Sequence, residues 1–75
     1  METDLQNILI FATDIKTESE KQQISNCLDN HLEISKWTID QEDIDCVLRI
    51  ESDTLCEEQI IHLISQHNFL CTILE

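Results

Sequence analysis

Apolar residues recur along the chain with two kinds of spacing, every second residue or every three to four residues. The two kinds follow one another in the order two, helical, two, two, helical, two. A period of two is typical of a strand, and the spacing i, i+3, i+4 is typical of an amphipathic helix. The pattern therefore predicts strand, helix, strand, strand, helix, strand. Two strand-helix-strand halves with right-handed crossovers form a four-stranded antiparallel sheet with both helices on one face, the ferredoxin-like α+β sandwich. We expect residues 1–75 to form this single domain.

The first half of the chain contains two predicted strands and one helix. Apolar residues alternate on both sides of the segment 5–12, which indicates a central strand whose two faces are both at least partly covered. Thr17 and Glu20 match the T-x-x-E capping box, so a helix is expected to run from Glu18 to Asn30. Segment 34–39 then predicts the second strand.

The second half repeats this plan. A hairpin is expected at 40–43, followed by a third strand at 44–50. Another T-x-x-E box at 54–57 is expected to open the second helix. Asn68 is the expected end of that helix, because Asn tolerates the left-handed backbone conformation found there. Segment 69–74 is the predicted last strand.

A period of two also divides the strand residues between the two faces of the sheet. The residues expected to face the helices are Ile8, Ile10, Ala12, Trp37, Ile39, Cys46, Leu48, Ile50, Cys71 and Ile73. The residues expected on the other face are Leu9, Phe11, Val47, Leu70 and Leu74. An apolar stripe of this size in water indicates association, either with a protein partner or between copies of the chain, through this face or its edge.

Sixteen acidic residues against four basic ones give a formal net charge of -12. This charge repels phosphate backbones and anionic lipids, so we expect no nucleic acid and no membrane as partner. An electrostatically attracted protein would be basic, although such a charge also serves plain solubility. Glycine is absent, which excludes glycine-rich phosphate loops. The pattern shows no nucleophile beside a base, so we expect no enzyme and no cofactor.

The four cysteines have separations that match neither a zinc finger nor a C-x-x-C redox motif. The acidic segment 1–4 lacks the basic and then apolar run of a secretory signal. We therefore expect free thiols and a cytoplasmic location.

Ile15, Thr17 and Glu20 precede an apolar spacing over 24–28 that is regular, and the pair at 68–69 is Asn-Phe. In these features the chain resembles the heavy-metal-associated domain, the fold of small copper chaperones and of cytosolic modules of metal-pumping ATPases. In that family a Met-x-Cys-x-x-Cys loop joins the first strand to the first helix. The alignment needs no gap and places Ile15 at the loop Met and Thr17 and Glu20 at the two cysteines. Asn-Phe matches the family's Gly followed by an aromatic residue.

The resemblance implies the family's fold without its metal loop. A hydroxyl and a carboxylate replace the two thiolates, whereas Cu(I) requires thiolate or thioether ligands. The leading hypothesis is therefore a non-catalytic cytosolic binding or interaction module with a degenerate metal site, which does not bind copper through this loop.

Two alternatives belong to other functional classes. One is a copper or zinc carrier or buffer that uses ligands outside the motif, namely Cys27, His31, Cys56 and His67, with His62 as a further candidate. Cys56, at the start of the second helix, is the cysteine to test for reactivity. The other alternative is a regulatory domain for a small ligand. A hard cation could also bind weakly near the hairpin, although a solvated acidic rim is the simpler interpretation. The residues expected at this end of the sheet are Asp14, Glu18, Glu20, Asp40, Glu42, Asp43, Asp45 and His67.

Overall fold

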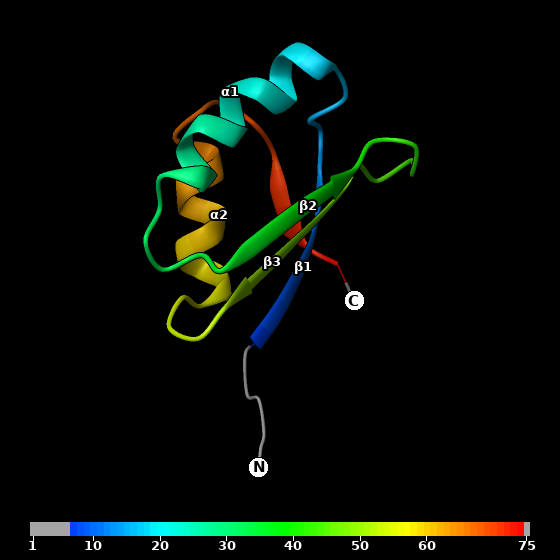
Figure 1. Ribbon diagram of the computed structural model, residues 1–75. Helices are drawn as coiled ribbons and strands as arrows, with labels where there is room; N and C mark the ends of the chain where they lie inside the picture. The colour runs from blue at the N-terminus through cyan, green and yellow to red at the C-terminus, as the bar shows by residue number, and fades with distance from the viewer. Residues whose placement is uncertain (1–6, 75) are drawn as a thin grey trace.

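The computed structural model describes residues 7–74. Its elements follow the predicted order: β1 (Asn7–Thr13), α1 (Glu18–Asp29), β2 (Lys36–Asp40), β3 (Val47–Ser52), α2 (Glu57–Ser65) and β4 (Cys71–Ile73). The strands form one sheet in the order β2-β3-β1-β4, and each neighbouring pair is antiparallel. Both helices lie on the same side of this sheet (Figure 1). The predicted ferredoxin-like α+β fold is therefore confirmed.

The side of strand β1 that faces the helices is the opposite of the side that the pattern predicts. Phe11 is fully buried and Leu9 packs against the core, whereas Ile8 is 48% and Ile10 36% exposed. Apolar residues stand on both sides of β1, so alternation alone could not choose between the sides. The antiparallel register makes the choice, because Phe11 lies opposite the buried Leu48. The predictions that Ile8 and Ile10 face the helices, and that Leu9 and Phe11 do not, were wrong.

Most other strand residues lie on the predicted faces. Ala12 is an exception, since alternation places it with Ile10 on the side away from the helices. Ile73 pairs with Phe11 and so shares the helix side, yet it remains 43% exposed in the short edge strand β4. The residues that are buried or packed against the core as predicted are Trp37, Ile39, Cys46, Leu48, Ile50 and Cys71.

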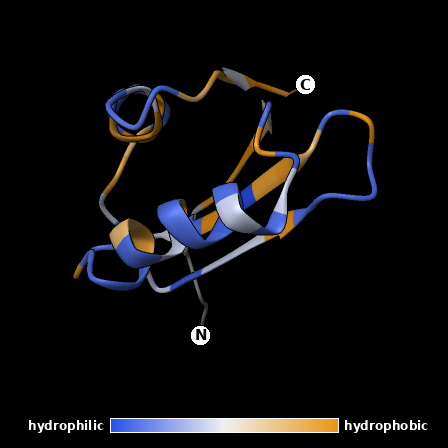
Figure 2. Ribbon diagram, turned by 90° about the horizontal axis from the view of Figure 1, so that it is seen from above, coloured by the Kyte–Doolittle hydropathy of each residue, from blue (hydrophilic) through white to orange (hydrophobic). Residues whose placement is uncertain are grey.

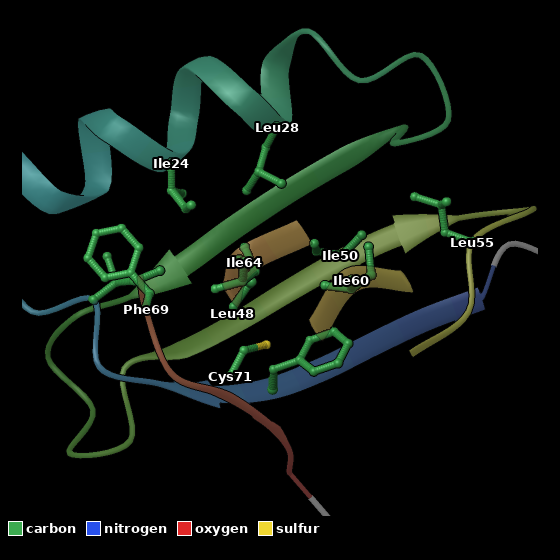
Figure 3. Close-up of a cluster of buried hydrophobic side chains, with 11 residues drawn as sticks. Ile24, Leu28, Leu48, Ile50, Leu55, Ile60, Ile64, Phe69 and Cys71 are labelled. Carbon is green, nitrogen blue, oxygen red and sulfur yellow. The ribbon is translucent and has the colours of Figure 1, made fainter. Parts of the chain in front are cut away.

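The core fills the layer between the helices and the sheet (Figure 3). Each helix contributes two side chains to this layer and β3 contributes two more, all of them 0 or 1% exposed: Ile24, Leu28, Leu48, Ile50, Ile60 and Ile64. Full burial of an aliphatic side chain of this size contributes about 1.5–3 kcal/mol. The central strands and the two helices are thus held by one continuous apolar cluster.

The connection between β3 and α2 is organised by a buried hydroxyl. Ser52 is fully buried, its Oγ donates to the carbonyl of Glu33 (2.6 Å), and it accepts from the Thr54 N–H (3.2 Å). This turn delays the helix, which begins after Cys56, whose N–H donates to Gln59 Oε1 (2.8 Å). The predicted capping box at 54–57 was therefore wrong. The Thr54 hydroxyl instead donates to the Glu33 carboxylate (3.0 Å).

The loop between β2 and β3 is longer than the predicted hairpin and delays the third strand. Strand β3 begins at Val47, so Ile44, predicted in that strand, lies in the loop and is 92% exposed. The loop extends from the body of the molecule and is mainly hydrophilic (Figure 2). Cys46 ends it with a φ of 45°. Asn68 has a φ of 68°, which confirms the left-handed conformation predicted beyond the second helix.

Substitutions at adjacent positions of β1 test which side of the strand is buried. We expect Phe11→Ala to lower the free energy of unfolding by about 3–5 kcal/mol, because it leaves a cavity in the core. Ile10→Thr keeps a β-branched residue on the exposed side and should cost about 1 kcal/mol or less. Urea denaturation followed by circular dichroism measures both values. A larger loss for Ile10→Thr than for Phe11→Ala would contradict the structure.

Candidate functional site

The resemblance places the metal-binding motif in the loop between β1 and α1, residues 14–17, here called the cap loop. This loop is built as a helix cap. Thr17 Oγ1 accepts from the Glu20 N–H (3.1 Å). Glu20 Oε1 accepts in return from the N–H groups of Lys16 (2.9 Å) and Thr17 (3.1 Å). These backbone donors lower the pKa of the Glu20 carboxyl, since they stabilise its ionised form. The predicted capping box is therefore confirmed at this position.

Further contacts from other elements fix the same loop. Ile15, at the position of the family's loop Met, is fully buried in the core. Gln41, just after β2, donates from Nε2 to the carbonyl oxygens of Thr17 (2.8 Å) and Ile15 (3.3 Å). Thr13 Oγ1 donates to the carbonyl of Cys46 (2.7 Å). The segment that would hold a metal ion in the family is here a hydrogen-bonded scaffold tied to the β2–β3 loop.

The predicted metal ligands lie on different parts of the fold. Cys27 is half-buried on α1, and His31 follows that helix with its Nδ1 accepting from the Glu33 N–H (3.2 Å). Cys56 is exposed at the start of α2, whereas His67 follows the other end of this helix, which is about 14 Å long for its nine residues. Within residues 7–74, no three His, Cys, Asp or Glu side chains are grouped so that they could hold a metal ion.

The remaining candidate side chains are the cysteine thiols and His62. All four cysteines are free, and burial raises the pKa of the Cys71 thiol to about 12 and also raises the pKa of Cys27. His62 Nε2 is 3.1 Å from Gln66 Nε2, one helical turn away. A raised thiol pKa lowers the fraction of thiolate, the form that binds metals and attacks electrophiles, at both Cys71 and Cys27.

The acids around the β2–β3 loop serve mainly as acceptors for nearby backbone groups. Asp40 Oδ1 accepts from the Glu42 N–H (3.1 Å), and Asp43 Oδ1 accepts from the Asp45 N–H (2.9 Å). Just after β1, Asp14 Oδ1 accepts from the N–H of Leu70, which precedes β4 (2.9 Å). These bonds stabilise turns in a chain that has no glycine or proline to form them.

The side of the sheet away from the helices is the second candidate site, here called the open face. Its apolar part follows β1 and β4, where Leu74 donates from its N–H to the carbonyl of Ile10 (3.1 Å). Its charged part follows β2 and β3, where Lys36 lies opposite Glu51. Alternation and register assign these residues to the open face: Ile8, Ile10, Ala12, Lys36, Thr38, Asp40, Val47, Arg49, Glu51, Leu70, Thr72 and Leu74.

The open face differs from the rest of the surface in charge. It contains two of the four basic residues of the chain, Lys36 and Arg49, which balance its two acids, Asp40 and Glu51. The chain as a whole has a net charge of -12. The exposed Arg49 lies opposite Ile10, and its guanidinium makes no hydrogen bond or ion pair with another residue of the segment 7–74. A neutral face, with a guanidinium that has no partner among residues 7–74, is therefore set into an acidic molecule.

Three of the five residues predicted for an interaction face lie on the open face: Val47, Leu70 and Leu74. Leu9 and Phe11 do not, since they face the helices. Arg49 was not predicted to be part of this face. The signal was present, because Val47, Arg49 and Glu51 alternate with the three buried residues of β3, Leu48, Ile50 and Ser52.

Comparison with models of known protein families gives no match, and comparison with curated proteins gives none either. Within residues 7–74, neither helix is both long and apolar enough to span a bilayer.

The ionised Glu20 side chain should make stability depend on pH. Its folded pKa is below the ordinary value of 4.5, so its contribution is present above that value and is lost as the pH falls through the folded pKa. Glu20→Gln keeps an acceptor oxygen but cannot titrate. The difference in free energy of unfolding between the wild type and Glu20→Gln should therefore shrink as a urea denaturation series moves into acid.

Glu18→Gln, in the same helical turn, is the matched control for the loss of one charge. A constant difference between wild type and Glu20→Gln over the whole acid range would show that the carboxylate has no special role in the cap.

Introducing two thiols at the cap positions tests whether the loop has the geometry of the metal site in the family that the sequence resembles. We expect Thr17→Cys/Glu20→Cys to bind one Cu(I) under reducing conditions in competition with a chromophoric chelator, because Cu(I) prefers thiolates. Thr17→Ser/Glu20→Gln, which keeps the capping groups, should behave like the wild type. Tight stoichiometric copper binding by the wild type, lost in the Ser/Gln variant, would contradict the interpretation of this loop as a cap.

Proposed function

We propose that this chain is a non-catalytic interaction module that binds a protein partner through its open face. In this proposal the chain keeps the architecture of a heavy-metal-associated domain, and the metal-binding loop has become a helix cap. The observation that supports it most is the apolar part of the open face, where Ile8, Ile10 and Leu70 are 48, 36 and 69% exposed on a sheet surface that neither helix covers.

Burial of this surface supplies a driving force for binding. Each Å² of apolar area removed from water contributes roughly 25 cal/mol, and neighbouring side chains on a flat sheet can be covered together. Isolated exposed apolar residues are normal, whereas adjacent ones on a strand pair mark an interaction surface. Ile10 is central to the patch, because Arg49 lies opposite it on one side and Leu74 pairs with it on the other.

The charges of the open face indicate the chemistry of the partner. Arg49 and the apolar residues beside it form the kind of surface found at interface centres, where Arg is enriched. We infer a partner surface with apolar side chains at its centre and a carboxylate that receives the guanidinium of Arg49. The acidic remainder of the chain favours a partner that is neutral or basic outside the contact area.

The cap loop supports a role without a resident metal ion, since Thr17 and Glu20 are both engaged with backbone groups. The free cysteines fit a reducing compartment, and a cytoplasmic location is part of the proposal.

Site-specific crosslinking in cells tests the proposed surface. A photoreactive residue in place of Thr72, on the open face, should give a discrete adduct with one protein, whereas the same residue in place of Gln23, exposed on α1, should not. The protein identified in the adduct is then purified, and its affinity for the chain is measured directly. Ile10→Thr should weaken that affinity by about tenfold, the effect of truncating a central apolar contact.

Ile44→Thr is the matched control, because it makes the same change at an isoleucine that is 92% exposed in the β2–β3 loop. Equal affinity for the wild type and Ile10→Thr, or the same adducts from positions 72 and 23, would refute binding through the open face.

A further inference from the structure

Among residues 7–74, strand β2 forms one edge of the sheet and has β3 as its only neighbouring strand. An edge strand presents a row of backbone N–H and C=O groups that can pair with another strand. Proteins often protect such an edge with proline, a bulge or charged side chains, Lys in particular. The five residues of β2 include no proline, and none of them has a positive φ. This edge is therefore regular and suited to pairing.

The sequence of β2, Lys-Trp-Thr-Ile-Asp, is complementary to itself when it is read in the opposite direction. If two copies pair antiparallel about Thr38, Lys36 of each copy lies opposite Asp40 of the other. Trp37 then lies opposite Ile39, and Thr38 lies opposite Thr38. Opposite charges, an aromatic with a β-branched residue, and two threonines are the favourable combinations for directly opposed residues on a sheet.

The faces of β2 are compatible with this pairing. Lys36, Thr38 and Asp40 are exposed and point to the open face, while Trp37 and Ile39 are half-buried against the core. Directly opposed residues in an antiparallel pair share a face, so charged residues would meet charged ones and apolar residues apolar ones. The Trp37 side chain is already oriented by a hydrogen bond from its Nε1 to Asp29 Oδ1 (2.7 Å).

We propose that the β2 edge binds β2 of a second copy of this chain, in antiparallel register about Thr38, and forms a continuous eight-stranded sheet. The two-fold axis is then perpendicular to the sheet, so the helices of both copies lie on one side and the two open faces lie side by side on the other. This inference extends the proposed function, because the dimer presents a doubled binding surface.

The opposite edge of the sheet does not offer the same arrangement. Strand β4 has only three residues, Cys71–Ile73, and no charged residue. The β2 edge has one charge of each sign, so this register places two pairs of opposite charges between the two copies of an acidic chain. A five-residue edge buries less than the roughly 800 Å² per partner that is typical of stable complexes. We therefore expect a dimer that dissociates on dilution.

Charge reversal at the two ends of β2 tests this register. Lys36→Asp places acid opposite acid at both ends of the pairing, and Asp40→Lys places base opposite base. Each variant alone should have a dimer dissociation constant raised by about tenfold, whereas an equimolar mixture of the two should form a heterodimer, in which both charge pairs are attractive. Sedimentation equilibrium over a wide concentration range measures all three, with circular dichroism to verify the fold.

Arg49→Asp is the control, since it makes a comparable charge change on the open face one strand away from the edge. It should leave the dimer intact, as should Ile10→Thr, so failure of the partner-binding proposal can be told apart from failure of this one. Hydrogen exchange adds a backbone readout, because amides of β2 should become protected as the concentration of the wild type rises.

A wild type that stays monomeric at the highest concentration would overturn the proposal. So would a dimer that persists in Lys36→Asp and Asp40→Lys, or a mixture of these variants that associates no better than either one alone.

Discussion

The side on which β1 buries its residues determines the rest of the architecture. Leu9 and Phe11 pair across the sheet with Ile50 and Leu48, and these four side chains form the floor on which both helices pack. Because successive residues of a strand point to opposite sides, this choice also exposes Ile8 and the residues that alternate with it. The orientation of this one central strand thus determines which residues form the core and which form the open face.

Polar side chains stabilise turns that in most proteins contain glycine or proline. The chain contains neither residue, yet two positions within residues 7–74 have a positive φ, and Cys46 and Asn68 occupy them. The conformation of Cys46 is held by its own N–H, which donates to the carbonyl of Asp43 (2.9 Å), and by the hydroxyl of Thr13, which donates to its carbonyl (2.7 Å). The loop beside this residue also anchors the segment before α1 through Gln41. The end of the sheet that would hold a metal ion in the family is therefore stabilised by neutral hydrogen bonds and carboxylate caps.

Element order and the first helix cap could be predicted because they depend on local signals. A change of hydrophobic period and a T-x-x-E box at Thr17 are visible in a few consecutive residues. The face of β1 could not be predicted, because apolar residues occupy both of its sides and the choice depends on its partners in β3. The start of α2 was also missed, since it depends on the long-range bond between Ser52 and Glu33. The residues of the candidate site could not all be predicted for the same reason, because the open face follows from the orientation of β1.

Nuclear magnetic resonance of isoleucine and leucine methyl groups in the presence of a soluble paramagnetic agent tests the orientation of β1 most directly. The structure predicts strong attenuation of the methyl signals of Ile8 and Ile10, while those of Leu9 and of the buried Ile24, Ile50, Ile60 and Ile64 are retained. Strong attenuation of the Leu9 methyl signals together with protection of Ile10 would show that β1 is inverted, and the open face described for this protein would not exist.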